Sequence, residues 1–161
     1  MKIRPVILCG GAGTRLWPDK KNYQAKQFID FGGWTLIQKT LERIKNSIFD
    51  YPIISTNHKY LSHVRFHLKK NNIRKYKIVL EPAKKNTAPA ILASSLIKDI
   101  PNEQPIIFFP ADHLIEKTSA FNKSINKNKK NLNNRNIFIF GIKPTNPSSE
   151  YGYFLSKKIN K

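Results

Sequence analysis

A glycine-rich segment with basic residues close behind it is the part of this sequence best suited to chemistry. Residues 10–15 read GGAGTR and directly follow a short apolar run. Glycines let backbone amides approach an anion closely and form a concave nest for phosphate. Arg15 offers a planar fork for phosphate oxygens, and Lys26 follows as a point charge. The segment indicates a phosphate site, and a glycine-rich turn with a surface arginine is the alternative.

The segment lacks the features of two widespread phosphate-binding motifs. A dinucleotide-binding fingerprint that starts at Gly11 needs a further glycine where Leu16 stands, and no Gly-Lys-Ser or Gly-Lys-Thr closes a Walker A loop. The loop therefore indicates phosphate binding of another type.

Two further segments contain residues suited to binding or catalysis. Residues 81–89 read EPAKKNTAP, and residues 110–113 read PADH. The carboxylate of Asp112 is a hard oxygen ligand of the kind that Mg²⁺ prefers. Because the aspartate follows a proline at the end of an apolar run, it is equally suited to capping the next helix. These residues alone leave both interpretations open.

The apolar pattern predicts the elements that must position these segments. Short apolar runs alternate with amphipathic stretches, which is typical of an α/β fold: a Rossmann-like open, mostly parallel sheet with helices on both faces. Ligands of such sheets bind outside the carboxyl ends of the strands, where all three segments fall. We predict strands at 4–9, 52–55, 77–80, 105–109, 137–142 and 151–155, and helices at 35–47 with Thr35 as N-cap, 59–70, 88–100 and 117–135.

Length and composition narrow the class of protein. The 161 residues suffice for one domain, and we expect no second one. The sequence has no run of 18 apolar residues and no signal peptide, and its single cysteine, Cys9, excludes a disulfide framework. We therefore expect a cytoplasmic protein without membrane contact, in which Cys9 is a small buried hydrophobic residue. His63 and His67 have a zinc-compatible spacing without an evident third ligand, so we predict a surface helix there.

The charge balance is strongly basic, with 29 Lys and Arg against 10 Asp and Glu, a net charge of +19. Nucleic acid is the usual partner of such a surface. Only six of the 29 are arginine, the preferred reader of phosphates, and the basic residues are spread along the chain. We therefore expect no nucleic-acid partner and interpret the basic stretch at 117–135 as a solvated helix face.

Four motifs in a fixed order resemble one enzyme family. The stretch GGAGTRLWP at residues 10–18, followed by KQF at 26–28, resembles the signature of the sugar-phosphate nucleotidyltransferases. Its LWP and KQF elements are similar to the mannose-1-phosphate guanylyltransferase branch. Residues 81–91 (EPAKKNTAPAI), 109–113 (FPADH) and 141–145 (GIKPT) with YGY at 151–153 resemble further family segments.

This resemblance implies a fold, a reaction and a set of site residues. It implies a nucleotidyltransferase fold of the glycosyltransferase-A-like type, in which mannose 1-phosphate attacks the α-phosphorus of GTP, diphosphate leaves and GDP-mannose forms. Mg²⁺ is the implied cofactor, held by Asp112. The implied catalytic residues are Arg15 and Lys26, and the implied nucleotide-binding residues are Gly10, Gly11, Gly13, Thr14, Glu81, Asn86 and Thr87.

The sequence also departs from the family pattern. Ala25 stands where proline usually precedes KQF, Lys85 stands where arginine is usual, and Glu150 replaces a common glycine. The resemblance covers only the front of the family's catalytic domain, so we expect residues 1–161 to be an N-terminal portion with a nucleotide half-site. Expected partners are GTP and mannose 1-phosphate, with either a homo-oligomer or a missing C-terminal half. The alternatives are a non-catalytic nucleotide-binding remnant, a sugar nucleotidyltransferase with another base or sugar, and a basic RNA-binding protein.

Overall fold

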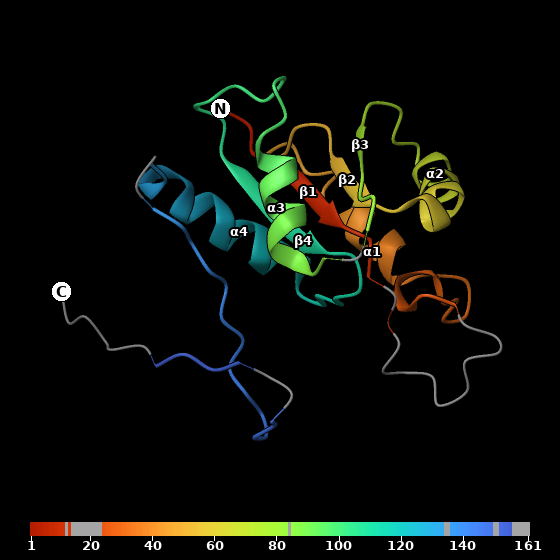
Figure 1. The fold of residues 1–161 in the computed structure, drawn as a ribbon. Coiled ribbons are helices and arrows are strands. Elements are labelled where there is room, and N and C mark those ends of the chain that lie inside the picture. The colour runs from red at the N-terminus through yellow and green to blue at the C-terminus, as the bar shows by residue number, and fades with distance from the viewer. Residues whose placement is uncertain (12, 14–23, 84, 134–135, 150–151, 156–161) are drawn as a thin grey trace.

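The fold is built on a four-stranded, fully parallel sheet (Figure 1). This computed structural model describes residues 1–11, 13, 24–83, 85–133, 136–149 and 152–155. The strand order is β3-β2-β1-β4, so the first strand lies in the interior of the sheet. The strands are β1 Arg4–Leu8, β2 Ile53–Thr56, β3 Lys77–Leu80 and β4 Ile106–Pro110.

Sequence composition explains why β1 is central. Val6 and Ile7 have no solvent exposure, and an apolar strand of this kind is stable only where both of its faces are covered. Val6 aligns with Ile53 of β2 on one side and with Phe108 of β4 on the other. This register brings the carboxyl ends of the four strands to one edge of the sheet.

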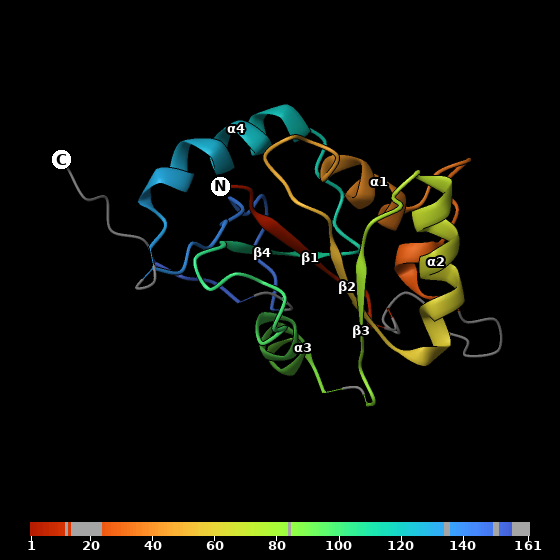
Figure 2. The ribbon, with the colours of Figure 1, turned by 90° about the horizontal axis from the view of Figure 1, so that it is seen from above.

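Helices cover both faces of the sheet, as the sequence predicts. Helices α1 (Leu36–Arg43), α2 (Leu61–Lys70) and α4 (Thr118–Asn128) lie on one face, and α3 (Thr87–Ser95) lies on the other (Figure 2). The side chain of Thr35 caps α1 by accepting a hydrogen bond from the amide of Gln38 at 3.2 Å, which confirms the predicted N-cap.

Alternate residues along the strands pack into two separate clusters. Ile7, Ile54 and Phe109 face α1, α2 and α4 in the larger cluster. Val6 and Ile53 point the other way and pack with Ile100 in a smaller cluster on the α3 face. This alternation follows from the two-residue period of a strand.

Two predicted strands are absent from the described part of the chain, and three helices end earlier than predicted. Residues 137–142 and 152–155 form neither helix nor strand and run away from the sheet (Figure 1). An extended segment becomes a strand only when its backbone groups pair with a neighbour, and here Ile139 remains 76% exposed. The ring of Phe140, 5.1 Å from that of Phe121, contacts α4. Helix α1 ends at Arg43, α3 at Ser95 and α4 at Asn128, each several residues before the predicted end.

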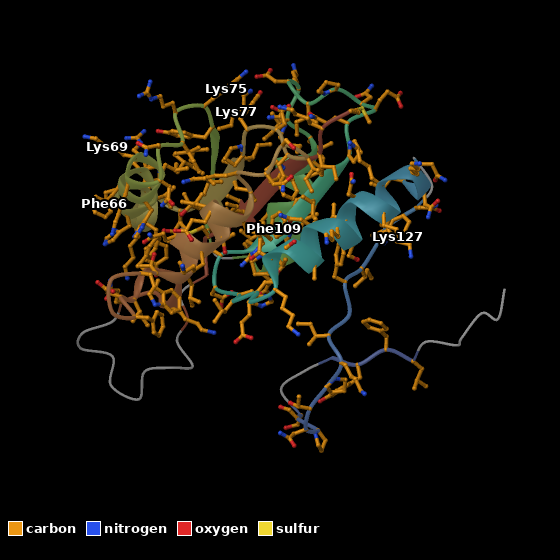
Figure 3. The ribbon with its side chains drawn as sticks, turned by 180° about the vertical axis from the view of Figure 1, so that it is seen from behind. Phe66, Lys69, Lys75, Lys77, Phe109 and Lys127 are labelled. Carbon is orange, nitrogen blue, oxygen red and sulfur yellow. The ribbon has the colours of Figure 1, made fainter. Side chains whose placement is uncertain are left out.

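Basic side chains project from different elements of the fold. Lys69 extends from α2 and Lys127 from α4, whereas Phe109 lies between α4 and the sheet (Figure 3). Lys77 forms an ion pair with Asp99. This distribution agrees with the expectation of solvated helix faces. Within the described ranges, no helix has the length and apolar character needed to cross a membrane.

Candidate functional site

The carboxyl edge of the sheet brings together the segments that sequence analysis selected. The glycine loop follows β1, Asn57 follows β2, Glu81 follows β3, and Asp112 comes two residues after β4. Because the four strands are parallel, these four chain exits must lie at the same edge. The sheet thereby gathers residues that are up to a hundred positions apart in the sequence.

One group at this edge consists of Gly13, Lys26 and Asp112. The Nζ atom of Lys26 lies 3.9 Å from Oδ2 of Asp112, and both side chains are somewhat more than one-third exposed. Gly13 has a φ of +65°, and a Cβ atom there would lie 3.0 Å from Cβ and 3.1 Å from the backbone nitrogen of Lys26. The glycine loop therefore passes directly against the residue that begins the 3₁₀ turn Lys26–Phe28.

A long, half-exposed ion pair of this kind contributes little to folding stability. Both charged groups remain accessible to solvent, so they are also accessible to a ligand. A cation beside a carboxylate that can hold a divalent ion is suited to a polyphosphate, which carries several negative charges. At about 4 Å a single charge pair is worth on the order of 4 kcal/mol at an effective dielectric constant of ~20.

A second group at the same edge consists of Gly10, Ser55 and Glu81. A Cβ atom on Gly10 would lie 2.7 and 2.8 Å from the two carboxylate oxygens of Glu81, which is closer than any side chain permits. The hydroxyl of Ser55 donates to Oε1 of Glu81 at 2.8 Å, and the amide of Glu81 donates to the carbonyl of Thr56 at 2.7 Å. Glycine at position 10 is what allows the carboxylate to reach the loop.

Cys9 directly precedes the glycine loop and is buried. Burial raises the pKa of the Cys9 thiol to about 12, and the negative charges of Asp112 and Glu81 add to this effect. A hydrogen bond with Gln27 acts in the opposite direction. The thiol has no solvent exposure, which agrees with the expectation of a small buried hydrophobic residue. With so high a pKa the thiol stays protonated and is no nucleophile near neutral pH.

Three polar side chains that the sequence did not single out hold the glycine loop from the side of the sheet. The Nε2 atom of Gln27 donates to the carbonyls of Cys9 and Gly11, at 3.3 and 3.0 Å. The hydroxyl of Thr56 also donates to the carbonyl of Cys9, at 3.3 Å, and Nδ2 of Asn57 donates to that of Gly10, at 3.2 Å. The available signal was a run of polar residues, Ser-Thr-Asn at 55–57, at the carboxyl end of a buried strand.

The remaining predicted residues have different outcomes. Thr14 and Arg15 lie outside the described residues. Asn86 and Thr87 are exposed at the start of α3, where Asn86 has a φ of +64° and its side chain makes no capping hydrogen bond. Six of the predicted residues therefore lie at the carboxyl edge of the sheet: Gly10, Gly11, Gly13, Lys26, Glu81 and Asp112. Asn86 and Thr87 lie instead at the start of α3.

The donor set at this edge fits a magnesium ion that is shared with a ligand. Within the described part of the chain, no three His, Cys, Asp or Glu side chains are grouped so that they could hold a metal ion by themselves. Mg²⁺ is commonly held by one or two carboxylates together with substrate phosphates and water. The half-exposed carboxylate of Asp112 meets that requirement, and the pair His63 and His67 instead packs against the ring of Phe28. The predicted surface helix is present as α2, with His63 exposed and His67 on its buried face, 6% exposed.

Comparisons with known proteins identify the family to which the chain belongs. Residues 4–158 match the family described as Nucleotidyl transferase. Over 159 residues the chain is 36% identical to a mannose-1-phosphate guanylyltransferase of Escherichia coli, a match that covers 96% of this chain and 34% of the relative. A protein of the same name from Salmonella typhimurium is 32% identical over 157 residues, covering 95% of this chain and 33% of that protein.

Solved structures show the same fold. The crystal structure of a mannose-6-phosphate isomerase from Helicobacter pylori is similar with a TM-score of 0.62 and 29% sequence identity, covering 81% of this chain and 46% of that one. The chain therefore belongs to the nucleotidyl transferase family and has its Rossmann-like fold, as its motifs predict. Within the family, the relatives named above are mannose-1-phosphate guanylyltransferases, and the chain spans about a third of their length.

Proposed function

We propose that this chain is the nucleotide-binding, N-terminal portion of a mannose-1-phosphate guanylyltransferase, which forms GDP-mannose and diphosphate from GTP and mannose 1-phosphate. The observation that carries the proposal is the approach of Lys26 to Asp112, at 3.9 Å, beside Gly13 at the carboxyl edge. A loop of glycine amides, a cation and a carboxylate are the groups that a magnesium-bound triphosphate requires. The names of the relatives support the choice of guanosine and mannose.

In this proposal the chain's own residues bind and position, and none forms a covalent intermediate. The phosphate oxygen of the sugar attacks the α-phosphorus in line, the bond to the β,γ-diphosphate breaks, and diphosphate leaves with the electron pair. Lys26 would neutralise charge on the α-phosphate, and Asp112 would hold Mg²⁺. Bound Mg²⁺ supplies positive charge to the phosphate oxygens. Positioning and charge stabilisation account for most of the catalysis in such a displacement.

Arg15, Thr14, Glu81, Asn86 and Thr87 complete the proposed nucleotide site. Arg15 would hold the leaving β,γ-phosphates through its planar guanidinium group, with Thr14 beside it in the loop. Glu81, Asn86 and Thr87 would line the base and ribose pocket, and Glu81 is supported by its position against Gly10. The proposal also includes a cytoplasmic setting.

Calorimetric titration tests the nucleotide assignment directly. GTP, ATP, dTTP and a single-stranded oligonucleotide are titrated into the protein with and without Mg²⁺. We expect GTP to bind most tightly and to need Mg²⁺. Preference for dTTP or ATP would indicate a transferase with another base, and oligonucleotide binding that weakens steeply with salt would indicate an RNA-binding protein.

Formation of GDP-mannose tests the reaction. GTP, mannose 1-phosphate and Mg²⁺ are incubated with the protein, and the sugar nucleotide is separated by anion-exchange chromatography. Turnover by this chain would establish the activity and contradict the expectation of a nucleotide half-site alone. Tight GTP binding without turnover would agree with that expectation, and it is also the result that a non-catalytic remnant would give. Adding the remaining two-thirds of the Escherichia coli relative as a separate chain distinguishes these two cases.

A further inference from the structure

Three consecutive backbone carbonyls of the glycine loop accept hydrogen bonds from side chains that come from two different parts of the fold. The donors are Gln27, in the turn after the loop, and Thr56 and Asn57, at the end of β2. Gln27 is 3% exposed and Thr56 is fully buried, so these two donors approach the loop from the protein interior, while Asn57 is partly buried. We call Gln27, Thr56 and Asn57 the carbonyl clamp.

The orientation of a carbonyl determines the orientation of the next amide. In a planar trans peptide the C=O of one residue and the N–H of the following residue point in opposite directions, and the described part of the chain contains no cis peptide. Because the carbonyl of Cys9 points toward Gln27 and Thr56, the N–H of Gly10 points away from the interior. The carbonyl of Gly10 points toward Asn57, so the N–H of Gly11 is also turned away from its donor.

The loop would not hold this arrangement without the clamp. Glycine loses more conformational freedom on ordering than any other residue, and neither Gly10 nor Gly11 has a side chain that could anchor its peptide plane. Gly11 is exposed, with no atom within 4 Å of a hypothetical Cβ. Without the clamp, the Gly10–Gly11 peptide could rotate and present a carbonyl oxygen to the ligand, where it would repel a phosphate.

We propose that Gln27, Thr56 and Asn57 are positioning residues that aim the amides of Gly10 and Gly11 at the phosphates of the nucleotide. Donors that are oriented before the ligand arrives need no reorganisation when it binds, which is the general advantage of a preorganised polar site. The inference rests on the proposed nucleotide site, but it concerns polyphosphate recognition and not the choice of base. Its test can therefore use inorganic diphosphate, which has no base.

The decisive variant is Asn57→Asp, which keeps the shape of the side chain and replaces its N–H donor with an oxygen. A carboxylate oxygen placed against the carbonyl of Gly10 repels it and favours rotation of the Gly10–Gly11 peptide. The matched control is Asn72→Asp, which introduces the same charge at an exposed residue. Asn72 has a φ of +57°, a conformation that aspartate also tolerates, and it follows α2 on the way to the amino end of β3, the opposite edge of the sheet.

Two readouts separate positioning from a general loss of structure. The first is affinity for Mg²⁺ diphosphate and Mg²⁺ GTP by calorimetry. We expect Asn57→Asp to weaken the binding of both ligands by roughly tenfold or more, because the charge-assisted hydrogen bond from the amide of Gly11 to a phosphate oxygen is lost. The melting temperatures of Asn57→Asp and Asn72→Asp should stay close to each other. The second is the amide chemical shift of Gly10 and Gly11, which should change on adding diphosphate to the wild type and to Asn72→Asp but not to Asn57→Asp.

A second pair of variants covers the case in which Asn57→Asp fails to fold. Thr56→Val keeps the shape of the side chain and removes the hydroxyl, whereas Thr56→Ser keeps the hydroxyl. We expect weaker diphosphate binding in Thr56→Val and rescue in Thr56→Ser.

Three results would overturn the clamp: wild-type affinity for diphosphate in Asn57→Asp, equal weakening in Thr56→Val and Thr56→Ser, or no diphosphate binding by the wild type. If the wild type binds diphosphate and dTTP but not GTP, the proposed function fails and the clamp stands.

Discussion

Replacing Gly13 with alanine tests the local geometry on which the placement of Lys26 depends. Gly13 has a φ of +65°, and its added Cβ would lie 3.0 Å from Cβ and 3.1 Å from the backbone nitrogen of Lys26. The left-handed conformation costs a residue other than glycine about 1–2 kcal/mol. The close contact involves the base of the side chain and the backbone, which cannot swing away, and overpacking of this kind costs about 1–3 kcal/mol.

The lower ends of these two contributions together give a stability loss of about 2 kcal/mol. For a domain of this size each kcal/mol lowers the melting temperature by about 2–4 °C, so we expect a decrease of about 4–8 °C in Gly13→Ala. Displacement of Lys26 should also weaken the binding of Mg²⁺ GTP. Thermal unfolding followed by circular dichroism measures the first effect, and calorimetry measures the second.

Gly11→Ala is the matched control, since it adds the same methyl group to the same loop. No atom lies within 4 Å of that position, and its φ is outside the left-handed region. Alanine also restricts the unfolded chain, so the melting temperature should stay the same or rise slightly, by an amount that corresponds to about 0.4–1 kcal/mol. If Gly13→Ala unfolds at the same temperature as Gly11→Ala, the packing of the loop against Lys26 is wrong.

Three further changes test other contacts of the site and the core. Gly10→Ala should weaken GTP binding with little change in melting temperature, because its methyl group displaces the half-buried carboxylate of Glu81 from Ser55. Unchanged GTP affinity in calorimetry would contradict the contact between Gly10 and Glu81. Asp112→Ala should abolish the Mg²⁺ dependence of GTP binding, and persistence of that dependence in the same titration would place the metal elsewhere. Burial, with smaller effects of Lys70 and His63, lowers the pKa of His67, so the unfolded chain takes up a proton below about pH 6.5 that the folded chain does not. The free energy of unfolding should therefore fall as the pH decreases from 7 to 5. In thermal unfolding, His67→Leu should reduce the dependence of the melting temperature on pH, whereas the exposed control His58→Gln should leave it unchanged.

The parts of the fold that follow from local patterns could be predicted from the sequence. The apolar runs at Ile7, Ile54 and Phe109 gave the correct strands, because burial on both faces requires continuous hydrophobic residues. Thr35 was identified as an N-cap from its type and position alone. The parallel order of the strands then placed the glycine loop, Glu81 and Asp112 at one edge before any distance was known.

Features of the fold that depend on contacts between distant segments of the chain could not be predicted in the same way. Residues 137–142 form an apolar run, yet such a run shows only that a segment is able to pair and does not supply the neighbouring strand. The carbonyl clamp was missed for a related reason. The sequence shows that Thr56 and Asn57 are polar, but only the register of β1 and β2 shows that their side chains face the carbonyls of Cys9 and Gly10.

The location of a bound metal nucleotide is the most direct test of the account. Mn²⁺ replaces Mg²⁺ with GTP, and its unpaired electrons broaden the amide signals of nearby residues in a nitrogen–proton correlation spectrum. We predict selective broadening at Gly10, Gly13, Lys26 and Asp112, with the signals of α2 and α4 unaffected. Broadening centred on either helix, with the glycine loop unchanged, would contradict the account.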